Sequence, residues 1–340
     1  MRERIEWIDF ARGYSIFTIV CYHGLQRVAL PPLWAQAIAF GGTGVHLFFL
    51  LSGFGFSLSE RAFRPGIFFR KRLMKVWLPY VLALCISWFA AAGFHLFPDG
   101  LHAWLAGVSL YQMFSEQYIE SFGGHFWFIS AIAGLYLAYP LLLYIQRRAG
   151  DGVMLVFATA VSLIWWWLVF FLEKGHFRTW NSFFLQFLWE FALGMALAGW
   201  YKTRTAAIKE WSKKRWWLGL AAGALFTALM VLMLLKMGDA GRIFNDPPAL
   251  AGYAAFCFFL YGFGRRYAPL LERFFRWIGG FSYSLYLIHV LVLAAYLCLL
   301  DRLHIPAKWP FLLPFPVLAL LAGKAFESLS RRWTALFDRK

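Results

Sequence analysis

Long apolar stretches, separated by short polar loops, recur along the whole chain. Each approaches the ~20 residues that an α-helix needs to cross the hydrocarbon core of a bilayer. We predict spans at residues 8–28, 38–58, 76–97, 124–145, 152–172, 180–201, 216–236, 247–263, 278–299 and 309–327. Stretches of this length exclude a membrane β-barrel. The pattern therefore predicts an all-α, polytopic membrane protein with about ten transmembrane helices.

Composition and charge agree with this interpretation. Hydrophobic residues make up 61% of the chain, whereas a soluble domain is nearer half apolar. The net charge of +16 raises the alternative of nucleic-acid binding, but the basic residues lie in short loops. With the N-terminus inside, 26 of the 33 Lys and Arg residues fall on the cytoplasmic side. This positive-inside signal predicts cytoplasmic termini and argues against a nucleic-acid partner. Without internal repeats or linkers, residues 1–340 are predicted to form a single domain.

The first span carries an unusual polar stripe. Arg12 and His23 are eleven residues apart, about three helical turns, so both fall on one face about 16 Å apart. Asp9 shares that face. Ionisable groups inside a membrane are costly, and therefore indicate a functional site by default. The structural alternative is that Arg12 pairs with Asp9 and that His23 bonds a backbone carbonyl.

Other spans also contain polar groups. The second span is rich in glycine, which we interpret as helix packing, and Ser52 is placed to bond across such a contact. It also holds a second intramembrane imidazole, His46. Glu190 in the sixth span is an isolated acid, and we expect it to pair with a basic residue.

A basic segment follows the second span, with Arg70, Arg72 and Lys75 just before a Pro-Tyr pair. Such a cluster at the inner mouth would attract phosphate groups. The alternative is ordinary anchoring of a cytoplasmic loop.

Two further spans bear histidines together with aromatic residues. The fourth opens with His125 and Trp127, and the ninth contains Tyr283 and His289. We predict that these side chains bind a hydrophilic acceptor, because a sugar can stack on an aromatic ring.

The order of these motifs resembles acyltransferase family 3, whose members are membrane proteins that O-acylate sugars and related cell-surface molecules. The motifs are Asp-x-x-Arg-Gly and His23, Gly-Val-x-x-Phe-Phe-x-x-Ser-Gly-Phe, the basic loop, His-x-Trp-Phe, and Ser-Tyr-x-x-Tyr-Leu-x-His. The resemblance covers about residues 5 to 330. One departure is that His46 stands where an Asp usually follows Gly-Val.

The resemblance implies about ten helices around a polar pore, with the N-terminus in the cytoplasm. It implies transfer of an acyl group, commonly acetyl, from cytoplasmic acyl-CoA to a hydroxyl of a cell-surface carbohydrate or lipid-linked glycan. Acyl-CoA (acetyl-CoA) would be a co-substrate, and we expect no permanently bound cofactor and no metal. The expected location is the cell membrane, specifically a bacterial cytoplasmic membrane.

Residue roles follow from the same resemblance. Arg70, Arg72 and Lys75 would hold the CoA phosphates, with Ser52 also on the donor side. Arg12, fixed by Asp9, would guide the donor or stabilise charge at the thioester carbonyl. His23 would act as general base or carry a transient acyl group. The rival class is a transporter or flippase of a lipid-linked sugar or small solute, which also needs a polar pore.

Overall fold

The computed structural model describes residues 5–28, 40–59, 63–94, 100–306 and 308–337, together with positions 31, 38 and 97. Over these residues the chain is helical, and no strand occurs among them. Seven helices in this part of the chain are long and apolar enough to cross a membrane. The prediction of an all-α, multi-pass membrane protein is therefore confirmed, whereas the count of about ten is not.

The difference in number has a local cause. Helix α7 (Trp127–Phe171) includes two predicted spans, and only Gly150, with φ 88° and ψ 171°, interrupts its helical backbone. Helices α1 (Glu6–Leu25) and α12 (Asp246–Tyr267) coincide with the first and eighth predicted spans but are not among the seven. Helix α1 carries Glu6, Asp9 and Arg12, which lower its mean hydropathy, whereas in α12 the stretch between its charged ends is diluted by proline, glycine and tyrosine.

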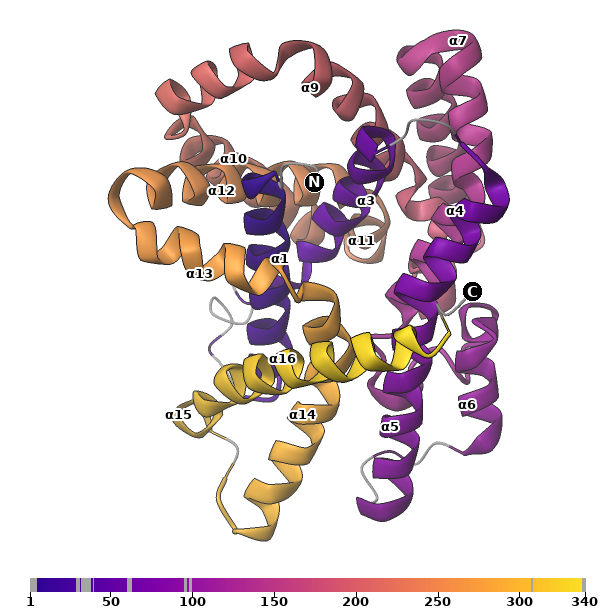
Figure 1. The fold of residues 1–340 in the computed structure, drawn as a ribbon, viewed down its shortest axis with the longest axis vertical. Coiled ribbons are helices and arrows are strands. Elements are labelled where there is room, and N and C mark those ends of the chain that lie inside the picture. Colours follow the sequence, from indigo (N-terminus) through magenta and orange to yellow (C-terminus); the bar gives the residue numbers. More distant parts are fainter. Residues whose placement is uncertain are drawn as a thin grey trace. The chain divides into compact units, whose positions relative to one another are not determined.

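The chain divides into two compact units that alternate along the sequence. The first unit comprises Met1–Ser15, Thr43–Ala62 and Ile132–Gly279, and the second comprises Ile16–Gly42, Phe63–Ala131 and Gly280–Lys340. Helix α1 (indigo in Figure 1) starts in the first unit and ends in the second, and α7 starts in the second and continues in the first. The prediction of a single domain over 1–340 stays a prediction.

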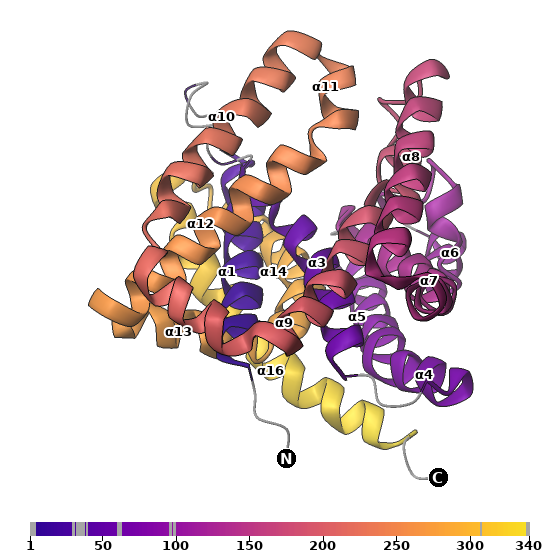
Figure 2. The ribbon, with the colours of Figure 1, turned by 90° about the horizontal axis from the view of Figure 1, so that it is seen from above.

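The first unit contains, besides parts of α1 and α7, a set of long and short helices. Their bounds are α3 (Gly44–Ser59), α8 (Arg178–Asn181), the 3₁₀ helix η4 (Phe184–Phe187), α9 (Leu188–Arg215), α10 (Leu218–Met237), α11 (Asp239–Phe244), α12 and α13 (Pro269–Gly279). Helices α10 and α12 run side by side (Figures 1 and 2).

Glycines allow the helices of this unit to approach closely. A Cβ atom at Gly53 of α3 would lie 1.9 Å from the Phe191 carbonyl oxygen of α9, and one at Gly194 of α9 would lie 2.0 Å from the Leu50 oxygen of α3. Neither position tolerates a larger residue without separating the helices. The expectation that glycines of the second span serve helix packing is confirmed.

The second unit is built from the end of α1, the beginning of α7 and the remaining helices. Their bounds are α4 (Pro65–Arg72), the π-helix η1 (Leu73–Trp77), α5 (Leu78–Phe94), α6 (Leu101–Val108), the 3₁₀ helices η2 (Tyr111–Phe114) and η3 (Ser121–Gly123), α14 (Ser282–Arg302), α15 (Trp309–Leu312) and α16 (Pro314–Ala335). Helices α14 and α16 pack against each other, and both contact α5.

Candidate active site

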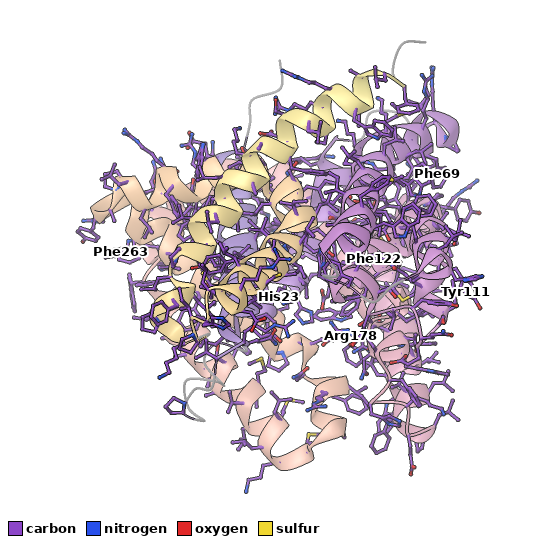
Figure 3. All side chains as sticks on the ribbon, turned by 90° about the horizontal axis from the view of Figure 1, so that it is seen from below. His23, Phe69, Tyr111, Phe122, Arg178 and Phe263 are labelled. Atoms are coloured by element: carbon purple, nitrogen blue, oxygen red, sulfur yellow. The ribbon has the colours of Figure 1, made fainter. Side chains whose placement is uncertain are left out.

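Three histidines from distant parts of the sequence meet in the second unit. The ring centroid of His289 on α14 lies 5.2 Å from that of His23 on α1 and 5.1 Å from that of His125, just before α7. His125 and His289 are buried, at 4% and 0% exposure, whereas His23 is partly exposed. His23 is therefore the imidazole of this histidine cluster that a substrate can reach most directly. Figure 3 labels His23.

Backbone carbonyls orient the two buried rings. His289 Nδ1 lies 2.7 Å from the Tyr286 carbonyl oxygen, and His125 Nε2 lies 3.5 Å from that of Leu287. Because a carbonyl only accepts, these nitrogens carry the proton in the neutral rings, and the other nitrogen of each ring keeps its lone pair. Within the described residues, those other nitrogens, His289 Nε2 and His125 Nδ1, have no hydrogen-bond partner.

An unusual backbone segment places His125 beside α14. Phe122, Gly123 and Gly124 have φ values of 56°, 102° and 72°, so three successive residues are in the left-handed region. Glycine adopts this conformation without strain. A Cβ atom at Gly123 would also lie 2.4 Å from Val290 Cγ1 of α14. Gly123 therefore allows a tight approach to the helix that carries His289, and Gly124 completes the left-handed turn before His125. Phe122, at the start of this turn, is labelled in Figure 3.

The basic segment lies in the same unit, where α4 passes into the π-helix η1. Arg70 and Lys75 are exposed, and Arg72 is partly buried, with its guanidinium 5.5 Å from the centre of the Phe68 ring. Leu78 N–H bonds to the Leu73 carbonyl, the wider spacing of a π-helix. Such turns are frequent at functional sites.

Aromatic side chains of α14 connect this basic segment with the histidine cluster. The Tyr283 hydroxyl donates to the Val76 carbonyl of η1 at 2.6 Å, and its ring lies 6.4 Å from that of Tyr286. Tyr286 in turn donates to the His125 carbonyl, and its ring lies 6.0 Å from that of His289. Tyr283, which we predicted on the acceptor side, thus directly contacts the predicted donor segment.

A buried amide that the sequence did not single out supports this arrangement. The Gln112 side-chain nitrogen lies 3.2 Å from the Tyr80 hydroxyl, the Phe126 carbonyl and the Ser130 hydroxyl, so three acceptors share its two N–H groups. The Tyr80 hydroxyl donates to the Gly107 carbonyl. This network joins α5, α6, η2 and the start of α7, so it stabilises the chain on both sides of His125.

Trp127 is buried, at 8% exposure. A ring that is almost fully covered offers little surface for stacking, although its role as an acceptor site stays a prediction.

The first unit holds the other predicted residues. Arg12 is partly buried on α1, and Asp9 and Tyr136 are its electrostatic partners. Its guanidinium lies beside Gly55 of α3, where a Cβ atom would be 3.8 Å from Nη2. Ser52 lies on the same helix, α3, and is partly buried.

The first unit also contains a polar cluster that the sequence did not predict. His46 Nδ1 on α3 lies 2.7 Å from Glu190 Oε1 on α9, and His46 Nε2 lies 3.9 Å from Asp246 Oδ1 on α12. The expectation that Glu190 pairs with a basic residue is confirmed. Asp246 and its hydrogen-bond partner Gln186 belong to no motif that the sequence singles out.

Comparison with known families agrees with these motifs. The model of the acyltransferase domain of acyltransferase family 3 matches residues 5–322. The chain belongs to this family. No curated protein and no solved structure matches it. Together with the seven apolar helices, the family identifies the chain as a multi-pass membrane acyltransferase.

Proposed function

We propose that this protein is an O-acyltransferase that moves an acyl group, most simply acetyl, from cytoplasmic acyl-CoA to a hydroxyl of a cell-surface carbohydrate or lipid-linked glycan. The observation that carries the proposal is the histidine cluster of His23, His125 and His289, which shares a unit with the basic segment. The second unit thus combines groups suited to proton transfer with groups suited to phosphate binding.

The chemical step needs a base for the acceptor hydroxyl. His23, the most exposed member of the cluster, takes the hydroxyl proton while the oxygen attacks the thioester carbonyl. The C–S bond then breaks, an ester forms, and the departing CoA thiolate receives the proton from the His23 imidazolium. An imidazole suits both transfers because it gains and loses a proton near neutral pH.

The two buried histidines position this base. The ring nitrogens of His289 and His125 that carry no hydrogen-bond partner in the described structure are acceptors in the neutral tautomers inferred above. The His289 ring neighbours both other rings and can accept a hydrogen bond from a protonated His23 or from the acceptor hydroxyl. In a desolvated site such a contact is worth more than in water.

The donor enters at the basic segment. The nucleotide end of CoA is polyanionic, and Arg70, Arg72 and Lys75 supply positive charge where a cytoplasmic ligand arrives. The connection from Val76 through Tyr283 and Tyr286 to the histidine cluster supports a thioester that extends along α14. Arg12, which is costly to bury, is assigned to the donor or to charge at the thioester carbonyl.

The test is acyl transfer by the purified protein in lipid nanodiscs. We expect acetyl-CoA to lose its thioester only when a glycan or glycolipid extract is present, with a matching gain of acetyl mass on the acceptor. Mass spectrometry of surface glycans from cells with and without the chain identifies the acceptor. A transporter or flippase would leave acetyl-CoA intact, so an unchanged thioester with every extract contradicts the proposal.

A further inference from the structure

His46, Glu190 and Asp246 form a compact buried cluster outside the site described above; we call it the carboxylate cluster. One ligating atom from each residue lies within 4.8 Å of the others. Their exposures are 7%, 0% and 5%. Two carboxylates and one imidazole are thus removed from water in a small volume, which is costly without charge compensation.

The hydrogen bonds show that this compensation is incomplete. His46 Nδ1 contacts Glu190 Oε1 at 2.7 Å, so it carries the proton of the neutral ring. His46 Nε2 then presents its lone pair toward Asp246 Oδ1 at 3.9 Å. A protonated Nε2 would be too far from this oxygen for a normal hydrogen bond. A lone pair and a carboxylate oxygen that face each other at this distance leave room for a cation between them.

Two further buried oxygen atoms, one on Glu190 and one on a hydrogen-bond partner of Asp246, also lack partners. Within the described residues, Glu190 Oε2 and Gln186 Oε1 are buried without a hydrogen bond. The Gln186 amide nitrogen donates to Asp246 Oδ2 at 2.8 Å and to the Ile243 carbonyl at 2.9 Å, which fixes the orientation of the amide. Buried oxygens without donors are unusual in proteins. Here they occur on two residues that already belong to one polar cluster.

We propose that the carboxylate cluster binds a divalent first-row transition-metal ion, with Zn²⁺ as the best fit. His46 Nε2 and Asp246 Oδ1 would be ligands, because metal–nitrogen and metal–oxygen bonds of about 2.0–2.2 Å span a gap of this size. Glu190 would either supply a third ligand through Oε2 or accept the hydrogen bond from Nδ1–H. A carboxylate commonly accepts this bond from a metal-bound histidine. A divalent ion also neutralises the two carboxylates.

The fold prearranges these groups. His46, Glu190 and Asp246 all lie at the beginnings of their helices α3, α9 and α12. Helix α3 packs against both α9 and α12, and the α3–α9 contact is fixed by Gly53 and Gly194. Ligands on rigid helices hold their geometry better than ligands on loops. One imidazole with carboxylate oxygens favours Zn²⁺ or Mn²⁺ over the harder Mg²⁺.

The direct test measures metal content. The protein is purified with a tag that contains no histidine, desalted and analysed by inductively coupled plasma mass spectrometry. We expect about one equivalent of metal, and at least about tenfold less after Glu190→Gln or Asp246→Asn, because ligands set the affinity. The matched control is Glu272→Gln, another buried acid of the same unit, which pairs with Arg276 at 3.2 Å.

A second measurement uses the unaltered chain and so does not depend on variants that misfold. Wild-type protein treated with a chelator should melt at a lower temperature, and Zn²⁺ but not Mg²⁺ should restore it. Bound Co²⁺ should give visible absorption bands that the Glu190→Gln variant lacks. Absence of metal, with no Zn²⁺ shift in melting, overturns the proposal and leaves a proton-sharing network. Equal metal in Glu190→Gln and wild type shows adventitious binding and overturns it too.

The proposed metal site and the proposed acyltransferase activity can be refuted independently of each other. His23→Ala should bind metal as the wild type does, because His23 belongs to the other unit. Conversely, lack of metal in a protein that consumes acetyl-CoA would refute the metal site alone.

Discussion

The histidine cluster and the carboxylate cluster use the same side chain in different surroundings. In the first, the His289 ring lies 5.2 and 5.1 Å from two other imidazole rings, and backbone carbonyls orient the two buried rings. In the second, one imidazole stands between two carboxylates. The first cluster includes a partly exposed ring, whereas all three residues of the second are buried.

This difference separates two kinds of chemistry. Neutral imidazoles that carry lone pairs, with one of them accessible, suit proton transfer to and from a substrate. A buried imidazole with two carboxylates suits a cation, and its removal should affect the folded state before any reaction. Changes in the histidine cluster should therefore reduce turnover at nearly constant stability, and changes in the carboxylate cluster should do the reverse.

The largest effect is expected for His23→Ala. Loss of the general base should lower kcat by about 10²- to 10⁴-fold. Expression and melting temperature should stay close to wild type, because a polar group is removed from the membrane. The control is His102→Ala, an exposed histidine on α6 of the same unit. If His23→Ala folds and retains normal acyl transfer, the base must be sought among His46, His125 and His289.

His46→Ala should act mainly on stability. It leaves Glu190 and Asp246 buried without their shared basic partner, and removal of one member of a buried pair costs about 3–5 kcal/mol. Thermal unfolding in detergent measures the loss of stability, again with His102→Ala as the control. If the variant melts normally yet has lost acyl transfer, His46 takes part in the reaction, and the proposed division of roles between the two clusters is wrong.

Arg12→Lys tests a residue of the first unit that we nevertheless assign to turnover, unlike the residues of the carboxylate cluster. Lysine keeps the charge beside Asp9 but loses the planar fork of the guanidinium. We expect kcat to fall about tenfold to a hundredfold, because a charge-assisted hydrogen bond contributes about 1.5–3 kcal/mol. Circular dichroism and melting should be unchanged. Full activity would reduce Arg12 to a structural partner of Asp9.

Arg72→Ala should raise the KM for acetyl-CoA about tenfold with kcat retained, because a partly exposed phosphate contact is screened by solvent and salt. Raising salt should weaken donor binding by the wild type and have less effect on the variant. Arg148→Ala, an exposed arginine of the first unit, is the control. Unchanged donor kinetics would identify the basic segment as a topology anchor only.

The smallest effect is expected for Tyr283→Phe. The lost hydrogen bond to Val76 contributes about 0.5–1.5 kcal/mol, so we expect a small rise in donor KM as the π-helix loosens. Tyr296→Phe on the same helix removes a similar bond, to the Phe311 carbonyl, without touching the basic segment. Equal kinetics in the two variants would show that Tyr283 does not couple the donor segment to α14.

Local patterns in the sequence carry much of this description. Apolar runs predicted the helices, and the charged residues of α1 explain why it is not among the seven candidate spans. The spacing of Arg12 and His23 placed both on α1, and the glycines of the second span indicated close packing. Each of these properties depends on residues within a few turns of one another, so it can be read from a single segment.

The tertiary structure decided which polar residues meet. His23 and His289 are hundreds of positions apart in chain order, and only the packing of the second unit brings their rings together. The same holds for Glu190, which looked like an isolated acid but contacts His46, and for Asp246, which gave no signal. Neither the left-handed turn at Gly123 and Gly124 nor the π-helix at Leu73–Trp77 follows from periodicity. Hydrophobic periodicity specifies which face of a helix is buried, whereas the partner on that face is chosen by the packing of the whole chain.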